Sequence, residues 1–408
     1  MSDNPDVVVV GAGAAGLTAA IFAARGGKRV LVLETRPQPG AKIRVSGGGR
    51  CNVLPSRAEP DDFDTSGSRH AMRNILLSWP LDAVRTFFER DLGVALKTEE
   101  TGKVFPVSDD AREVVRALLE ACGRSGAEIR GGARVTALRL RGDGAGFRIE
   151  TASGDVLHAP RVILSTGGLS LPKTGSDGAG LAMARRLGHS VVPTRPALVP
   201  LTTDDERWRE LAGVSCGARL TVRRDDHAVE NRTGSLLVSH RGFTGPVVLD
   251  VSRHFTGDEA VRPGLTVQWG GGGAGDWETV LCSGGRGTVA GAMRERLPRR
   301  LTAFLLETAG VTAETRLSGL ARADRNRLVE ILERYPLPVS GHEGYRTAEV
   351  TAGGVPLAEV ATASMESRLV PGLFLCGEML DVVGRLGGYN FLWAWTSGRR
   401  AGEAAGRA

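Results

Sequence analysis

The chain has 408 residues, of which 41% are hydrophobic and 24% are charged, and its formal net charge is +6. This ordinary hydrophobic share with a low net charge excludes an intrinsically disordered protein, and the length predicts two or three domains. Glycine is unusually frequent, with 56 residues against 19 prolines, which indicates many tight backbone turns rather than linkers.

The charge pattern, the apolar segments and the cysteines exclude further classes of protein. The basic excess is mostly arginine, scattered among acidic residues without a run of five, so nucleic-acid binding is not favoured. No segment reaches the roughly 18 apolar residues of a membrane span, and residues 5–24 lack the basic start of a signal peptide. The five cysteines contain no CxxC pair, which argues against disulfides and zinc. We therefore expect a cytoplasmic protein with no metal site and no membrane partner.

The first predicted elements are a strand, a glycine turn, a helix and a second strand. Residues 7–10 are four valines, typical of a buried parallel strand. The string GAGAAG follows at 11–16, residues 17–25 have helical spacing, and 29–34 form a second apolar strand that ends in an acid. This order of elements is typical of a dinucleotide-binding βαβ unit.

Each glycine of this unit, and the acid that ends its second strand, has a physical role in holding a dinucleotide. Gly11 allows a tight turn, Gly13 lets the backbone approach a pyrophosphate, and Gly16 lets the helix pack close to the strand. The helix N-terminus attracts the phosphates. Glu34 is placed to accept hydrogen bonds from ribose hydroxyls. A second GxGxxG string at 270–275 lacks the following helix and acidic strand, so we interpret it as a loop.

The segment after the second strand predicts a large ligand. The loop from Ser46 to Asn52 contains three consecutive glycines, whose backbone amides can wrap a ligand. Arg50 and Lys42 can neutralise phosphate charge. Cys51 lies inside this loop, and we interpret it as a packing residue rather than a reactive thiol because no resolving cysteine is near.

The middle of the first half alternates helices and strands. Residues 75–92 and 110–125 have helical periodicity, and 133–140, 147–151 and 156–164 are predicted strands. The last of these strands leads to the string STGG at 165–168, a turn that brings backbone close to a nucleotide. The glycine-rich segment 172–180 then leads into a helix.

From about residue 191 the composition changes to short strands separated by turns. The predicted strands are 198–201, 218–222, 235–238 and 247–251, and they indicate a small β-barrel or sandwich. Residues 288–334 are predicted helices with an arginine-rich polar face. Near the C-terminus, residues 373–378 form a strand ending in Gly-Glu, the string GGYN lies at 387–390, and a helix follows from about 391.

These motifs together resemble the HI0933-like family of flavoproteins, which includes aminoacetone-oxidase-like and bile-acid-reductase-like members. The strings that carry the resemblance are GAGAAG at 11–16, SGGGRCN at 46–52, TGG at 166–168, TGSDG at 174–178, TAGGV at 351–355 and GE to GGYN at 377–390. The resemblance implies FAD binding, with residues 133–135 at the place where backbone contacts adenine. The sequence departs from the family pattern at Val383, Leu386 and Leu392, where polar residues are usual.

The predicted architecture is α/β, with a Rossmann-like FAD-binding domain of the two-dinucleotide-binding type and an inserted β-barrel-like plus helical domain. The FAD domain is expected to take residues 1–190 and 347–408, and the insert residues 191–346. The residues expected to bind the cofactor are Gly11, Gly13, Ala14, Ala15, Gly16, Glu34, Thr35, Lys42, Ser46, Gly47, Gly48, Gly49, Arg50, Cys51, Asn52, Val135, Thr166, Gly167, Gly168, Gly175, Asp177, Gly178, Gly377, Glu378, Gly388, Tyr389 and Asn390. No catalytic residue is assigned.

The resulting hypothesis is an FAD-dependent oxidoreductase with non-covalent FAD. Its favoured reaction is reduction of an activated C=C bond in a small organic substrate by NAD(P)H, which would dock transiently because no second dinucleotide motif is seen. One alternative is an amine oxidase or dehydrogenase that uses O₂. An alternative of another class is a flavin-binding protein without catalysis or associated with RNA.

Overall fold

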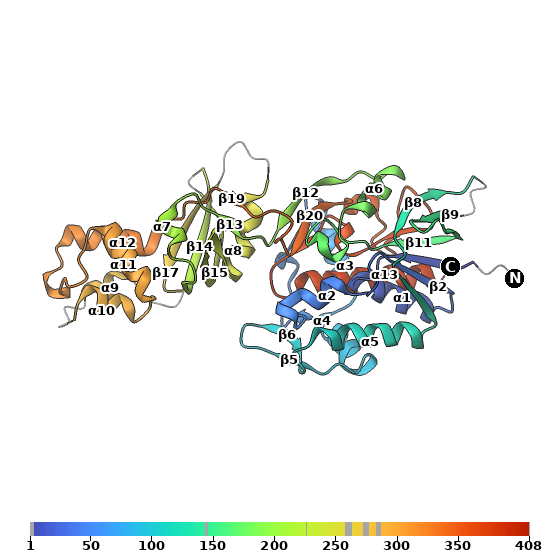
Figure 1. Ribbon diagram of the computed structural model, residues 1–408, viewed down its shortest axis with the longest axis horizontal. Helices are drawn as coiled ribbons and strands as arrows, with labels where there is room; N and C mark the ends of the chain where they lie inside the picture. The colour runs from blue at the N-terminus through green and yellow to red at the C-terminus, as the bar shows by residue number, and fades with distance from the viewer. Residues whose placement is uncertain are drawn as a thin grey trace. The chain divides into compact units, whose positions relative to one another are not determined.

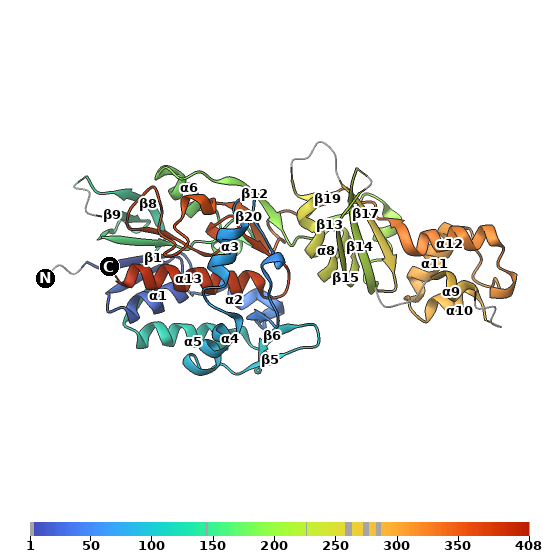
Figure 2. The same cartoon turned by 180° about the vertical axis from the view of Figure 1, so that it is seen from behind.

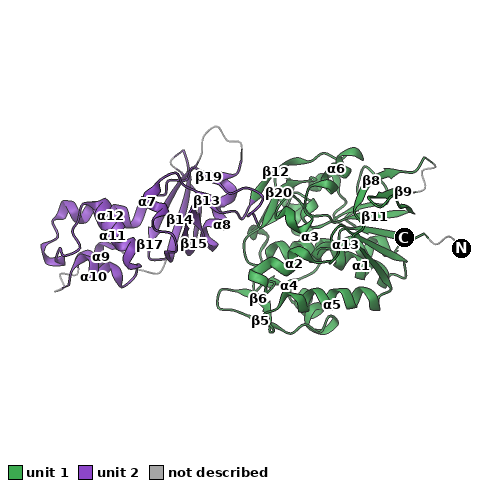
Figure 3. Cartoon of the chain, in the orientation of Figure 1, with its two compact units in different colours: residues 1–196, 349–408 green, residues 197–348 purple. Residues whose placement is uncertain are grey.

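The computed structural model describes residues 4–142, 146–225, 227–257, 263–271, 277–282 and 287–407. The chain divides into two compact units, one of residues 1–196 and 349–408 and one of residues 197–348 (Figure 3). The expected domain boundaries were 190/191 and 346/347. Strand β12 (Val192–Ala197) pairs with β20 (Val350–Gly354), and this pairing keeps nearly all of β12 in the first unit.

The first unit is built on a parallel sheet of five strands in the order β21-β11-β1-β2-β7. Val7 pairs with Arg161 on one side and with Val30 on the other, so the glycine turn after β1 lies between two neighbouring strand ends. This confirms the predicted Rossmann-type core. The strands are β1 (Val7–Val10), β2 (Val30–Glu34), β7 (Ala127–Gly131), β11 (Arg161–Leu164) and β21 (Leu373–Leu375).

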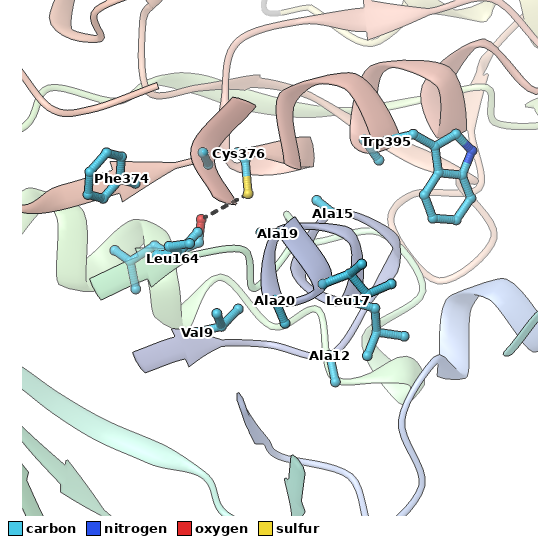
Figure 4. Packing of buried hydrophobic residues seen from close by; sticks show 14 of the residues in the cluster. Val9, Ala12, Ala15, Leu17, Ala19, Ala20, Leu164, Phe374, Cys376 and Trp395 are labelled. Carbon is cyan, nitrogen blue, oxygen red and sulfur yellow. Dashed lines mark hydrogen bonds between the residues drawn. The ribbon is translucent and has the colours of Figure 1, made fainter. Parts of the chain in front are cut away.

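Two helices from opposite ends of the chain pack together on this sheet. Helix α1 (Ala14–Arg25) and helix α13 (Tyr389–Arg407) lie side by side in Figures 1 and 2. A β-carbon on Gly402 would lie 2.2 Å from the Ala19 carbonyl oxygen, so the two backbones are in direct contact. Figure 4 shows Ala15 and Ala19 of α1 in this core with Trp395 of α13.

The remaining elements of the first unit surround the parallel sheet. Residues 75–92 do not form one helix, because Pro80 separates α3 from α4 and cannot continue a helix from the preceding turn. The elements are α2 (Ala41–Val45), β3 (Leu54–Pro55), β4 (Phe63–Asp64), α3 (Arg69–Leu76), α4 (Leu81–Thr86), β5 (Leu96–Thr98), β6 (Lys103–Pro106), α5 (Ala111–Arg124), β8 (Val135–Leu140), β9 (Phe147–Thr151), β10 (Val156–Ala159), α6 (Ala179–Arg186) and β22 (Val383–Gly384).

The second unit contains a seven-stranded sheet in the order β18-β17-β14-β15-β16-β13-β19, with antiparallel neighbours. A flat sheet of this width would separate its edge strands by about 29 Å. The edge strands β18 and β19 are joined by residues 337–340, and this segment can separate Pro336 from Gly341 by at most about 18 Å. The sheet is therefore strongly curled. Its strands are β13 (Leu201–Thr202), β14 (Ser215–Arg224), β15 (His227–Ser239), β16 (Gly242–Thr244), β17 (Gly264–Trp269), β18 (Tyr335–Pro336) and β19 (Gly341–His342).

The helices of this unit include one that the sequence analysis assigned as a strand. The prediction of a strand at 247–251 was wrong, because Pro246 begins helix α8 (Pro246–Val251), whose buried Val247 and Val251 lie one turn apart. The helices expected in 288–334 are present. The other helices are α7 (Glu206–Arg209), α9 (Trp277–Cys282), α10 (Val289–Arg294), α11 (Arg299–Ala309) and α12 (Arg322–Arg334).

The second glycine string at 270–275 lies largely outside the described residues. Among the residues that the structure describes, no helix has the length and apolar character needed to span a membrane.

Candidate functional site

The turn between β1 and α1 combines crowded glycines with one that faces open space. Gly11 has a φ of +102°, and a β-carbon on Gly16 would lie 1.9 Å from the Gly11 carbonyl oxygen. A β-carbon on Gly13 would meet no protein atom within 4 Å. Gly13 also precedes α1 without a side-chain cap. The first amides of α1, at Ala14 and Ala15, thus begin a helix whose positive end favours an anion.

Glu34 ends β2 beside this turn and is 9% exposed. Its Oε2 accepts a hydrogen bond from the Ala12 amide at 2.7 Å. A β-carbon on Gly175 would lie 3.8 Å from the other carboxylate oxygen, Oε1. The Ala133 amide donates to the Glu34 carbonyl at 2.8 Å, which places the start of β8, and with it Val135, near the end of β2. Thr35 follows Glu34 directly, and three segments that are distant in sequence therefore meet here.

The glycine loop 46–52 is rigid on one side and open on the other. Its three glycines at 47–49 have φ values of 57°, 69° and 87°, which other residues rarely adopt. A β-carbon on Gly48 would meet no atom within 4 Å, and one on Gly49 only an atom 4.0 Å away. The Ser46 carbonyl accepts a hydrogen bond from the Cys51 amide at 3.0 Å, which closes the loop.

Arg50 and Cys51 have surroundings of their own in this loop. The Arg50 guanidinium lies 2.6 Å from a Glu99 carboxylate oxygen and 3.5 Å from one of Asp109, and 4.0 Å from the centre of the Phe105 ring. Its charge is already matched by these acids, so its role toward a phosphate stays a prediction. Cys51 is fully buried, and burial raises the pKa of its thiol to about 12. A thiol of this kind is not a ready nucleophile.

Asn52 connects the glycine loop to the turn before α13. With its amide oriented to satisfy its neighbours, Oδ1 accepts from the Gly388 amide at 3.2 Å and Nδ2 donates to the Leu54 carbonyl at 3.0 Å. A β-carbon on Gly388 would lie 2.4 Å from the Leu54 carbonyl carbon, so the two backbones are in contact. The SGGGRCN and GGYN strings therefore form one structure.

The turn before α13 is shaped by its own asparagine. Asn390 Oδ1 accepts from the Gly384 amide at 2.8 Å, and its Nδ2 donates to the Gly384 carbonyl at 2.8 Å. Tyr389 packs edge-on against Phe63, with ring centres 5.7 Å apart. Both side chains thus hold the turn in place. Of the three departures from the family pattern, Val383 and Leu392 are buried and Leu386 is half-buried.

Lys42 and Glu378 meet in a polar network that joins four parts of the fold. The Lys42 ammonium lies 2.6 Å from Glu378 Oε2 and 2.6 Å from the Ser170 hydroxyl oxygen. Glu378 Oε1 accepts from the Ser170 hydroxyl at 2.8 Å and from the Thr351 amide at 2.8 Å. Thr351 Oγ1 accepts in turn from the Leu169 amide at 2.8 Å. Lys42 is therefore paired with a carboxylate, and its predicted contact with phosphate stays a prediction.

The segment after β11 completes this side of the unit. A β-carbon on Gly168 would lie 2.4 Å from Thr351 Oγ1, and one on Gly167 would lie 2.8 Å from the Ser176 hydroxyl oxygen. Asp177 forms an ion pair with Arg134 at 2.7 Å. The remaining predicted residues in these segments are Thr166, which donates to the Met379 sulfur at 3.0 Å, Gly178, which precedes α6, and Gly377, which follows β21.

Ser170 and Thr351 belong to this network but were not predicted from the sequence. Both are buried, at 0% and 1% exposure, and both hold Glu378. Thr351 opens the TAGGV string, which was recognised as a motif without a role for its threonine. Ser170 lies just after the TGG turn, and no sequence signal marks it because its importance depends on a contact with a residue more than 200 positions away.

The residues of this unit fit a dinucleotide cofactor. Within the two glycine strings at 11–16 and 46–52, β-carbons on Gly13, Gly48 and Gly49 would meet no protein atom closer than 4.0 Å, so these positions leave room for a ligand. The uncapped start of α1 supplies free amides for a pyrophosphate. Glu34 supplies a carboxylate at the end of β2, where a ribose is bound in folds of this type.

The chain belongs to the HI0933-like family. The model described as HI0933-like protein Rossmann domain matches residues 5–404. The ribosomal RNA dihydrouridine synthase of Escherichia coli K12 is 34% identical over 403 residues, which cover 96% of each chain. The 3-dehydro-bile acid delta(4,6)-reductase of Clostridium scindens is 33% identical over 406 residues, covering 97% of this chain and 98% of the relative. The ribosomal RNA dihydrouridine synthase of Haemophilus influenzae is 31% identical and covers 97% of both.

Solved structures support the same fold. The 3-ketosteroid-delta4-(5alpha)-dehydrogenase of Rhodococcus jostii has a TM-score of 0.51 at 17% identity and covers 100% of this chain and 98% of its own. A flavocytochrome c3 fumarate reductase has a TM-score of 0.51 at 17% identity, covering 99% and 78%. The protein is an FAD-dependent oxidoreductase, as the family match and the flavoenzyme fold agree.

Proposed function

We propose that the protein uses NAD(P)H to reduce a C=C bond conjugated to a carbonyl group. The supporting observation is that two relatives named for different substrates, an RNA and a bile acid, each match at least 96% of this chain. Dihydrouridine differs from uridine by two hydrogens across a C=C bond beside a carbonyl. A 3-dehydro bile acid with delta-4 unsaturation carries the same grouping. The bond type is what these reactions share.

The chain's own residues would hold the cofactor and prepare it for this reaction. FAD, when bound, supplies hydride transfer. The amides that open α1 and the bare backbone at Gly13 would bind its pyrophosphate, and Glu34 its ribose. The open glycines of loop 46–52 would lie along the cofactor. The start of α13, tied to this loop through Asn52, would place a helix dipole near negative charge.

The uracil ring of an RNA is the substrate that we favour. The scattered arginines do not favour nucleic-acid binding, but two relatives from different species bear the name ribosomal RNA dihydrouridine synthase. The net charge of +6 would assist binding of a polyanion. A small organic substrate with a conjugated carbonyl is the second candidate, which the bile acid reductase supports. The proposed location is the cytoplasm, where NAD(P)H is abundant.

The test starts from the flavin spectrum of the purified protein under anaerobic conditions. NADH or NADPH should bleach the flavin bands, and addition of a uridine-rich RNA transcript should restore them with formation of dihydrouridine. Restoration by a steroid enone but not by RNA would assign the second substrate class. Bands that stay oxidised with NAD(P)H but are bleached by an amine, together with peroxide release once O₂ is admitted, would replace the proposal by an amine oxidase. RNA binding without any flavin reduction would indicate a non-catalytic role.

A further inference from the structure

Lys103 on β6 is a half-buried cation that the site described so far does not use. Its side chain runs along the turn before α13, since a β-carbon on Gly387 would lie 3.8 Å from Lys103 Cγ and 4.0 Å from Cε. Among the described residues no carboxylate pairs with its ammonium, whereas Lys42 and Lys97 both form ion pairs. A positive charge held beside the turn without a counter-ion is available to attract an anion that binds there.

Backbone contacts fix Lys103 beside this turn. Lys103 is paired with Pro55 on β3, and the neighbouring Leu54 is in backbone contact with Gly388. The Val53 amide donates to the Val104 carbonyl at 2.8 Å, which ties the same strand to the end of the glycine loop. The position of Lys103 relative to the turn is therefore determined by three chain segments rather than by a flexible surface loop.

The local charges make this turn strongly favourable to an anion. Helix α13 starts at Tyr389 without an acidic residue in its first turn, so its positive end is not compensated there. Arg385 in the same turn is paired with Asp62 at 2.8 Å, which leaves that pair neutral. Lys103 adds a positive charge beside a positive helix end, an arrangement that favours binding of a negatively charged group there.

We infer that Lys103 stabilises the negative charge that FAD gains on reduction. The turn at 387–388 is joined through Asn52 to the loop whose open glycines fit FAD, so the cation and the cofactor site share one scaffold. A fixed positive charge near the flavin ring favours its reduced form. The inference depends on FAD binding and does not depend on the identity of the substrate.

The experiment measures the reduction potential of bound flavin without any substrate, by equilibration with a reference dye. Lys103→Met should lower the ratio of reduced to oxidised flavin at a fixed potential about tenfold, which corresponds to about 30 mV for a two-electron couple. The affinity for reduced FAD should fall about tenfold more than the affinity for oxidised FAD. Lys103→Arg should largely restore both values, because it keeps the charge.

Lys28→Met is the matched control, since Lys28 is half-buried like Lys103 but lies in the loop between α1 and β2, and its loss should leave the potential unchanged. Lys103→Gln provides a second, polar neutral variant if the methionine variant is poorly folded. An unchanged potential in both neutral variants would overturn the inference. So would an unchanged potential with a tenfold higher KM for an RNA substrate, because Lys103 would then bind substrate phosphate. Potentials are informative even if the proposed C=C reduction fails, so the two failures are distinguishable.

Discussion

In the unit formed by residues 1–196 and 349–408, helices touch through their backbones, whereas the unit of residues 197–348 is filled by large aromatic rings. On α13, Gly398, Gly402 and Gly406 recur every fourth residue, and β-carbons there would lie 2.4, 2.2 and 2.9 Å from carbonyl oxygens of α1. In the second unit, the centre of the Trp208 ring lies 4.6 Å from the centre of the Phe304 ring and 5.3 Å from the centre of the Phe243 ring.

The two kinds of core packing have different consequences for the two units. Close backbone packing of α1 against α13 holds the two helices, and with them the glycine turns of the proposed cofactor site, in a fixed relation. The aromatic core of the second unit supplies stability through buried area and volume. Motifs of the cofactor site accordingly lie in the first unit. The two kinds of core predict different responses to substitution.

The largest effect is expected in the aromatic core. Trp208→Ala removes a fully buried ring that contacts several others, and it should lower the free energy of unfolding of the second unit by about 4 kcal/mol. Denaturant titration followed by circular dichroism and by flavin absorbance would measure this. Leu77→Ala, at a side chain that is 56% exposed, is the control and should have little effect. Flavin release in the same early transition would show that the units do not unfold separately.

A somewhat smaller effect is expected where helix backbones touch. Gly402→Ala places a β-carbon 2.2 Å from the Ala19 carbonyl oxygen, so α13 must move away from α1 at a cost of about 3 kcal/mol. The flavin should be lost at lower denaturant concentration. Gly123→Ala is the matched control, because this helical glycine in α5 has no atom within 4 Å and should gain stability. Equal stability of the two variants would contradict the backbone-contact interpretation.

The next effect depends on pH and lies in the second unit. Burial opposes ionisation of Glu230, but the hydrogen bond from His254 and the charges of Arg253 and Arg232 outweigh it and lower its pKa to about 2. Because the folded pKa lies below the ordinary value of 4.5, this stabilisation is complete above about pH 4.5 and is lost as the pH falls through about 2. Glu230→Gln should therefore cost about 2 kcal/mol at pH 7.

Unfolding free energies of the wild type and of Glu230→Gln across this pH range provide the measurement. The difference between the two proteins should shrink as the solution becomes more acidic than pH 4.5. A difference that is the same at pH 7 and pH 3 would mean that Glu230 does not act through its charge. Glu295→Gln, at an exposed residue of the same unit, is the control.

The smallest effect on stability is expected at the open glycine of the phosphate turn. Gly13→Ala should leave the melting temperature of the apoprotein nearly unchanged, because its φ of −85° suits alanine and its β-carbon would meet no protein atom. Its affinity for FAD should fall at least about tenfold, since the methyl group would occupy cofactor space. Calorimetric titration with FAD would test this. Gly16→Ala should instead destabilise the apoprotein, and full FAD affinity in Gly13→Ala would refute the site.

Much of the fold could be predicted because local patterns decide it. The valine run at 7–10, the glycine string at 11–16 and the apolar strand ending at Glu34 each specify their structure through short-range rules, and all three are found as expected. The segment 247–251 was predicted wrongly, because a run of β-branched residues is compatible with a strand. Pro246 and packing against β15 make it a helix.

The charge partners of the predicted site residues could not be predicted from the sequence. Lys42 and Arg50 were chosen as phosphate ligands because they are cations inside a cofactor motif. Each also lies beside a carboxylate, Glu378 and Glu99 respectively, which is far from it in the chain, and its contact with phosphate stays a prediction. Pairing of charges across long sequence separations leaves no local pattern, so no reading of spacing could have found it.

The chain's residues alone therefore specified the βαβ unit, the glycine turns and the family, since these depend on period, turn chemistry and short strings. Tertiary structure decided which glycines face open space and which touch backbone, which cations are paired, and how Asn52 joins two distant motifs. The physical reason is that helix and strand propensities act over a few residues. Free space, burial and the pairing of charges depend on contacts between segments that are distant in sequence, and these contacts exist only in the folded chain.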